Sequence, residues 1–120
     1  MSARTYDRRQ AARLLPLLRS LAVELQERAT SLRRLEWMRK AFATSERAHR
    51  AELDELCADI ACNRYGLRRA QLEIEGLGCS LEDMEPVVIR IPAETGKRGD
   101  TFTWRPDQPY LLLRAADSAA

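Results

Sequence analysis

The chain has 120 residues, of which 45% are apolar and 32% are charged, and its formal net charge is +2. This length suits one domain with a modest core and excludes two. No stretch of about 18 uncharged apolar residues exists, so no transmembrane helix is expected, and the apolar run 14–18 is too short for a signal peptide. Three cysteines without a CxxC pair indicate reduced thiols in the cytoplasm and argue against a zinc site.

The charge is unevenly distributed along the chain. Residues 1–50 carry twelve basic and five acidic side chains, whereas residues 51–89 carry three basic and nine acidic ones. Two successive segments of opposite charge are expected to attract each other before either attracts an outside partner.

A long helix is predicted to begin near Arg8, because Asp7 and Gln10 have the spacing of a capping box. From Ala11 onward, apolar residues recur at the first (a) and fourth (d) positions of about ten heptads, as in a coiled coil. This apolar seam fails only around residues 39–49, where Arg39, Glu46 and His49 replace apolar side chains.

The interruption predicts that the chain reverses near residues 44–46. Residues whose numbers add to about 91 then face each other, which places Leu35 against Leu56. The two polar residues of the seam, Arg28 and Asn63, also share one layer, and matched polar layers fix the register of coiled coils. An antiparallel helical hairpin explains this pattern.

A second arrangement satisfies the same contacts. No Gly or Pro lies between Leu17 and Tyr65, and the heptad phase continues through the proposed turn. One unbroken helix that pairs antiparallel with a second copy would form a domain-swapped dimer. We favour the hairpin and keep the swapped dimer as the alternative.

The helical pattern ends at Gly76 and Gly78, which supply positions that tolerate left-handed backbone. Ser80 is then predicted to start a short turn that Pro86 closes, with Glu82 and Asp83 near its beginning. Beyond the turn, apolar residues alternate with a period of two and predict three strands. Their inward-facing side chains are Val87, Ile89, Ile91, Phe102, Trp104, Leu111 and Leu113.

The strands form an antiparallel meander with one apolar face, which needs a cover. The base of the hairpin is the nearest cover, through Leu14, Leu15, Leu18, Leu77 and Leu81. The expected fold is therefore α+β and mostly α. It is a single domain with a coiled-coil-like hairpin over residues 7–77, a three-stranded meander over 78–114 packed at its base, and a tail over 115–120.

Several short motifs carry a resemblance to a known family. They are Tyr6 before the capped helix, Leu14-Leu15-Pro16, Leu77-Gly78-Cys79, Asp83-Met84-Glu85, Ile89-Arg90-Ile91-Pro92-Ala93 and Trp104-Arg105. Together they span nearly the whole chain, which resembles the bacterial domain of unknown function family 2203. The resemblance implies a helical hairpin with a small sheet, in a protein whose activity is not established.

The chain departs from the family's pattern at several positions. Relatives tend to have glycine at the position of Val87, aspartate at that of Arg90 and cysteine at that of Thr103, and an aromatic–histidine pair in place of Arg114-Ala115. No functional residue is therefore carried over from the family.

Catalysis is not expected, because no convergent set of acid, base, nucleophile or metal ligand is present, and neither a cofactor nor a metal is predicted. His49 is the only histidine and is predicted to be an exposed turn residue. Glu82, Asp83 and Glu85 lack the glycine-containing loop of a calcium site, and their simpler role is to favour the start of a helical turn.

The tryptophan at position 37 is the strongest sign of a binding surface. Trp37 occupies the outer heptad position f, where a solvated hairpin is expected to carry charge. With Met38 beside it and Tyr65 at position f of the second helix, it predicts a self-association surface. Tyr65 and Leu72 lie toward the base, where the sheet is expected to cover them. Trp37 lies roughly 30 Å from the base, beyond the reach of a small meander.

The preferred function is a non-catalytic cytoplasmic interaction or scaffold module that self-associates through its hairpin as a homodimer, or binds another protein, without a membrane. The alternative is an RNA- or ribosome-associated protein that uses the basic tip of the hairpin. That tip consists of Arg39, Lys40, Arg47 and Arg50. Nucleic acid is not favoured, because the net charge is modest.

Overall fold

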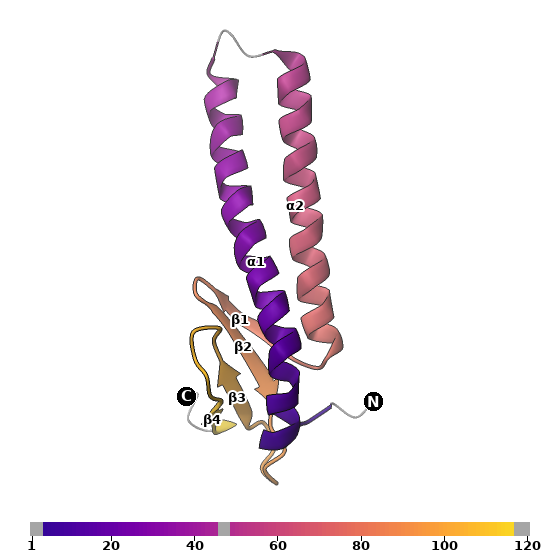
Figure 1. Ribbon diagram of the computed structural model, residues 1–120, viewed down its shortest axis with the longest axis vertical. Helices are drawn as coiled ribbons and strands as arrows, with labels where there is room; N and C mark the ends of the chain where they lie inside the picture. The colour runs from indigo at the N-terminus through magenta and orange to yellow at the C-terminus, as the bar shows by residue number, and fades with distance from the viewer. Residues whose placement is uncertain (1–3, 46–48, 117–120) are drawn as a thin grey trace.

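The computed structural model describes residues 4–45 and 49–116 of the chain. Two long helices run side by side, and a small sheet lies beside their base, so that the molecule measures 62 × 27 × 26 Å (Figure 1). The elements are α1 (Arg8–Ala43), α2 (Arg50–Gly76), β1 (Ser80–Met84), β2 (Val87–Pro92), β3 (Thr101–Trp104) and β4 (Leu112–Arg114). The predicted α+β architecture, mostly helical, is confirmed.

The ends of α1 follow from local sequence signals. The Gln10 backbone N–H donates to the Asp7 side chain, and the Asp7 backbone N–H donates to the Gln10 side chain, which completes the predicted capping box. The helix ends at Ala43, where the predicted reversal begins. Glu46, the last residue of the predicted turn, lies outside the described residues.

The end of α2 is fixed by glycine. Gly78 has a φ of +83°, in the left-handed region that the sequence analysis predicted, whereas Gly76 is the last helical residue. The Gly78 N–H donates to the Glu75 carbonyl and the Cys79 N–H donates to the Ile74 carbonyl. These bonds satisfy carbonyls at the helix end and turn the chain toward β1.

Two clusters of buried side chains hold the described part of the molecule together, and they differ greatly in size. The base cluster joins both helices to the sheet through Leu18, Leu21, Leu25, Ile74 and their neighbours. The distal cluster, near the tip, consists of Leu35, Leu56 and Ile60, with Leu32, Met38 and Phe42 partly buried around them. Since each fully buried side chain of this kind contributes about 1.5–3 kcal/mol, the distal half of the hairpin is held together far less strongly than the base.

The sheet has four antiparallel strands in the order β1-β2-β3-β4, one more than predicted. The extra strand is β1, where the sequence analysis predicted a short helical turn. Ser80 lies opposite Arg90 and Met84 opposite Val87, with an irregularity between Leu81 and Asp83. Strand pairing along β2 thus outweighs the preference of acidic residues for a helix start.

The inner face of the sheet matches the prediction along β2 and β3. Val87, Ile89, Ile91, Phe102 and Trp104 are all buried. The prediction fails in β4, where Leu111 is buried just before the strand but Leu113 is 51% exposed. β4 is a short edge strand, so its side chains reach beyond the cover that the helices provide.

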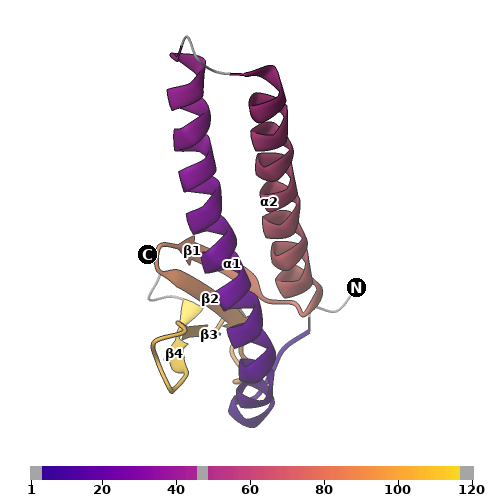
Figure 2. The ribbon, with the colours of Figure 1, turned by 45° about the horizontal axis from the view of Figure 1, so that its top comes forward.

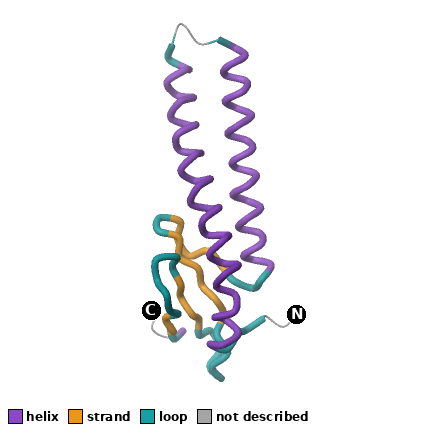
Figure 3. Tube along the Cα trace, in the orientation of Figure 1, coloured by secondary structure: helices purple, strands orange, loops and turns teal. Residues whose placement is uncertain are grey.

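The base of the hairpin covers the sheet as predicted. Leu14, Leu15, Leu77 and Leu81 are partly buried against the base cluster, and Leu18 belongs to it. Beyond the sheet, the hairpin continues as two helices alone (Figures 2 and 3). The N-terminal segment joins the sheet as well, because the Tyr6 N–H donates to the Pro92 carbonyl and the Glu94 N–H donates to the Tyr6 carbonyl.

Two arginines of α1 clamp the β3–β4 connection. The Arg8 guanidinium lies 5.1 Å from the centre of the Phe102 ring and donates to the Leu111 carbonyl. The Arg19 guanidinium lies 5.3 Å from the Trp104 ring and donates to the Pro106 carbonyl. Both contacts place the sheet on one side of α1 and leave another side of the helix open.

Candidate interaction surface

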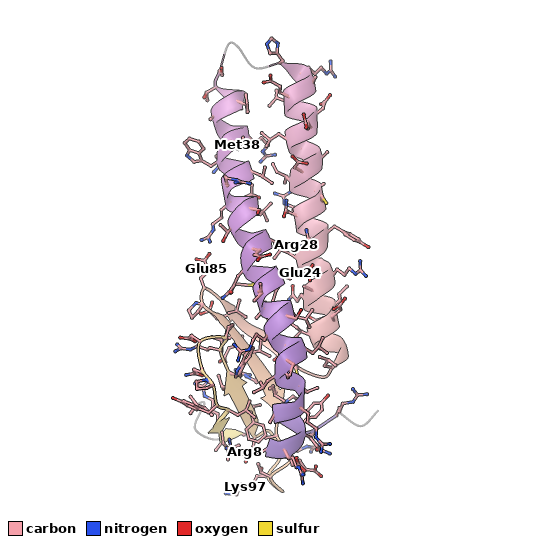
Figure 4. The ribbon with its side chains drawn as sticks, in the orientation of Figure 1. Arg8, Glu24, Arg28, Met38, Glu85 and Lys97 are labelled. Atoms are coloured by element: carbon pink, nitrogen blue, oxygen red, sulfur yellow. The ribbon has the colours of Figure 1, made fainter. Side chains whose placement is uncertain are left out.

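The distal half of α1 presents an exposed aromatic side chain beside a shallow apolar hollow. Trp37 is 71% exposed. A hollow of about 280 Å³ lies between it and Met38, Ala41, Phe42 and Ser45. Met38 lies on the distal half of α1, well beyond the sheet (Figure 4). The prediction that the sheet does not reach this region is confirmed.

A second hollow adjoins the first and is lined by both helices. It has a volume of about 210 Å³ and an apolar floor of Leu35, Met38, Phe42 and Leu56. Its rim carries the carboxylates of Glu52, Glu55 and Asp59. Because Met38 and Phe42 line both hollows, the apolar surface continues from Trp37 to the groove between the helices.

Within the described residues, the carboxylates of this rim have no cationic partner. Glu52, Glu55 and Asp59 are exposed, and none forms an ion pair with any residue in the described ranges 4–45 and 49–116. Sequence reasoning missed this group, although the spacing of 52, 55 and 59 puts all three residues on one face of a helix. The apolar floor of this hollow could not be predicted from the sequence, because it includes residues from the other helix.

A third hollow of about 310 Å³ follows the same groove toward the base. Tyr65 and Cys62 line it, together with Glu24, Arg28, Gly66, Arg69, Ala70 and Glu73. The Arg28 side chain lies against Gly66, where an added Cβ would overlap its Nε and Cζ atoms. Figure 4 shows Arg28 and Glu24 at mid-height in the hairpin.

Arg28 and Asn63, the polar residues predicted to share one layer of the seam, form no hydrogen bond with each other in the described structure. The Arg28 Nε donates to the Glu24 carboxylate 3.1 Å away, and the Asn63 amide donates to the Asp59 carbonyl at 3.0 Å. Each side chain thus bonds within its own helix. Arg28 reaches α2 at Gly66, three residues beyond Asn63, because a long side chain can lie across the groove where no Cβ blocks it.

These hollows define one face of the hairpin, which we call the open face. It is lined by Met38, Glu52, Asp59, Gly66 and Glu73, all at heptad position g. The sheet lies elsewhere: its β1–β2 turn packs near Gln26, Ala29 and Thr30, and Glu85 forms an ion pair with Arg33. At about 100° per residue, Arg33 and Met38 point roughly 140° apart around α1.

The prediction that the sheet covers Tyr65 and Leu72 is wrong. Tyr65 is 69% exposed and Leu72 is 48% exposed, although both lie on the basal half of α2. The sheet packs beside α1, and it meets α2 mainly where β1 follows the helix end, so the outer side of α2 is left uncovered. Tyr65 therefore lies on a separate part of the surface from Trp37 and Met38, which line the same hollow.

The basic tip is only partly described. Arg39, Lys40 and Arg50 are exposed, whereas Arg47 lies outside the described residues. His49 is exposed at the start of α2 and makes no capping hydrogen bond through its side chain. The exposed carboxylates of Glu52 and Glu55 belong to the next turns of the same helix, so the tip carries both signs of charge.

The contacts and exposure of the other candidate groups do not indicate a reactive or metal-binding site in the described residues. Glu82 binds Arg90 at 2.8 Å and Arg114 at 3.0 Å across the outer side of the sheet, so it bridges strands rather than starting a helical turn. Burial raises the pKa of the Cys79 thiol to about 11, which keeps it protonated and unreactive. Cys57 and Cys62 are exposed and free. Within residues 4–45 and 49–116, no three His, Cys, Asp or Glu side chains gather as a metal site.

Two positions at which the sequence analysis expects relatives to differ from this chain come together in the sheet. Arg90 in β2 lies directly opposite Thr103 in β3, on the outer face. In this chain the Arg90 guanidinium is bound to Glu82.

None of the helices in the described residues is long and apolar enough to span a membrane.

Comparison with known proteins agrees with the motifs in the sequence. A family model described as "Uncharacterized conserved protein (DUF2203)" matches residues 4–113, which include all the elements of the fold except the last residue of β4. No curated protein and no solved structure matches the chain. The chain belongs to the DUF2203 family of uncharacterized conserved proteins.

Proposed function

We propose that this protein is a non-catalytic cytoplasmic module that self-associates through its helical hairpin. The observation that carries the proposal is Trp37, which is 71% exposed beside an apolar hollow in the distal half of the hairpin. Large aromatic side chains beside pockets are enriched among the residues that dominate binding energy at protein interfaces. The free cysteines favour a reducing compartment.

The weak distal core supports the same function. Only Leu35, Leu56 and Ile60 are buried in the distal cluster of the described residues, and its other members remain partly exposed. A second copy that covers Met38 and Phe42 would complete this core and remove apolar surface from water. Each square ångström of apolar surface buried contributes roughly 25 cal/mol, so a patch of this kind can stabilise a dimer.

Binding of RNA at the basic tip has weaker support. Arg39, Lys40 and Arg50 are exposed, but the carboxylates of Glu52, Asp54 and Glu55 are exposed on the first turns of α2 beside them. These carboxylates repel phosphate groups and offset the basic charge. The self-association module is therefore the preferred function.

Sedimentation equilibrium tests the proposal. The wild-type chain should form a dimer at tens of micromolar (on the order of ordinary assay concentrations), and Trp37→Glu should raise the dimer Kd by about 30-fold, or ~2 kcal/mol. Tyr110→Glu is the matched control, because Tyr110 is 55% exposed on the β3–β4 connection, away from the hairpin tip. A wild-type monomer at these concentrations, or a dimer that Trp37→Glu leaves unchanged, would contradict the proposal.

A further inference from the structure

The acidic rim of the second hollow fits a cation with an apolar stem. Glu52, Glu55 and Asp59 surround a floor of Leu35, Met38, Phe42 and Leu56. An arginine side chain has both parts, an aliphatic stem for the floor and a guanidinium that binds carboxylates in pairs. In the described part of the chain, none of the three carboxylates has such a partner.

The same hairpin carries a suitable arginine at the same height. Arg34 is exposed and forms no ion pair in the described ranges. Leu35 and Leu56 pack in one cluster, which sets the register of the two helices. Arg34 is therefore level with residue 57 of α2, between Glu55 and Asp59. It lies at heptad position c of α1, beside the g residues of the open face.

We propose that a second copy of this chain docks on the open face with its hairpin parallel to the first. The two-fold axis runs along the hairpin, so that α1 of each copy lies over α2 of the other and both tips point the same way. The partner subunit's Arg34 then enters the carboxylate rim between Glu55 and Asp59. This geometry rests on the proposed self-association and specifies how it occurs.

The parallel arrangement also accounts for the exposed apolar side chains of the helices. These are Leu17 at heptad position g and Val23, Trp37, Tyr65 and Leu72 at position f. In the parallel dimer, the f edge of α1 lies beside the f edge of the partner's α2. Trp37 is then level with residue 54 and leans between the small side chains of the partner's Ala51 and the partner's Ala58. Tyr65 lies beside the partner's Val23.

The opposite orientation has an electrostatic cost. A two-fold axis perpendicular to the hairpin would lay α2 on α2 and α1 on α1, and α1 carries nine basic and only three acidic side chains. Like charges in contact at an interface disfavour the arrangement strongly. The open face along α2 is about 36 Å long and two helices wide, or roughly 700 Å² in each copy, near the ~800 Å² of an ordinary specific interface.

Distances between spin labels distinguish the two orientations. Cys57→Ser and Cys62→Ser remove the exposed thiols, and Cys79 is buried with a pKa of about 11. Thr44→Cys then places one label at each tip. The parallel dimer predicts tip-to-tip distances of about 20–30 Å, whereas the opposite orientation predicts about 40 Å or more, the length of α2. Mixed dimers carry Thr44→Cys in one copy and Glu75→Cys in the other. For these labels the parallel dimer predicts the longer distance and the opposite orientation predicts the shorter one.

Charge exchange tests the arginine contact itself. Arg34→Glu should raise the dimer Kd at least tenfold, and the pair Glu55→Lys and Asp59→Lys should do the same. Combining all three substitutions should restore at least half of the lost affinity on a logarithmic scale, because the charges are exchanged. Arg98→Glu, in the exposed β2–β3 loop, is the control for net charge and should leave the Kd within twofold.

The outcomes separate this inference from the function on which it rests. A monomeric wild-type chain would contradict both. A dimer with distant tips, or one in which the triple variant is weaker than either parent variant, would overturn the parallel geometry and leave self-association standing. Close tips together with charge rescue would support both.

Discussion

Gly66 lies in the middle of α2, where a glycine costs about 1 kcal/mol relative to alanine. The Arg28 side chain occupies the space that a Cβ at this position would need. Sequence patterns place Arg28 and Asn63 in the same layer but do not reveal that the arginine crosses the groove at Gly66. Side-chain length decides this contact, and heptad positions do not encode it.

The fit at Gly66 predicts the sign of a substitution. Gly66→Ala should raise the free energy of unfolding, by up to about 1 kcal/mol, because alanine favours the helix and the Arg28 guanidinium, at the far end of a flexible side chain, can move aside. Gly76→Ala is the control, since no atom lies within 4 Å of its added Cβ. Urea unfolding monitored by circular dichroism compares the two variants. A Gly66→Ala protein less stable than the wild type would show that the guanidinium cannot move aside.

Asp100 links the β2–β3 loop to Ala116, just after β4. Its carboxylate accepts hydrogen bonds from the Thr95 hydroxyl and the Ala116 backbone N–H, which, with nearby Lys97, lower the pKa of this carboxyl below its ordinary value of 3.8. A group with a lowered folded-state pKa stabilises the fold above its unfolded pKa and loses that contribution as the pH falls through the folded value.

The pH dependence of unfolding checks this contribution. The stability of the wild-type chain should fall more steeply below pH 3.8 than that of Asp100→Asn, whose side chain does not titrate. Between about pH 5 and 7 the two curves should run parallel. Identical slopes below pH 3.8 would show that Asp100 does not contribute to the acid sensitivity.

At the scale of elements, the helices and three of the strands were predictable, and β1 was not. The capping box at Asp7 and the left-handed Gly78 are local signals, and both operate as predicted. The sequence of β1 is mostly polar and acidic, because β1 is an edge strand in which only Leu81 and Met84 are partly buried. Its existence depends on pairing with β2, which a local pattern cannot show.

The arginines of α1 connect the helix to the sheet. Arg19→Ala should lower the free energy of unfolding by about 1 kcal/mol, because it removes both the contact with the Trp104 ring and the hydrogen bond to the Pro106 carbonyl. Arg13→Ala is the matched control, since Arg13 is an exposed residue of the same helix. Thermal unfolding followed by Trp fluorescence measures both. Equal stability of the two variants would exclude a clamp by Arg19.

At the scale of the whole molecule, the sequence predicted one long hairpin with a sheet at its base, because both rest on strong hydrophobic periodicity. The candidate surface was predicted only through Trp37, Met38 and Tyr65. The hollow that Glu52, Glu55 and Asp59 line is formed by residues of both helices. It can therefore be predicted only once the register of the folded hairpin is known. Exposure of Tyr65 and Leu72 depends in turn on which helix the sheet covers.

Small-angle X-ray scattering of the wild-type chain tests the central claim most directly, since it gives mass and length together. A parallel dimer has twice the mass of the 13.7 kDa chain, about 27 kDa, while its maximum dimension stays near the 62 Å of a single copy. A particle with the mass of one chain and a radius of gyration near 18.5 Å would contradict self-association. A dimer much longer than one hairpin would contradict the parallel arrangement.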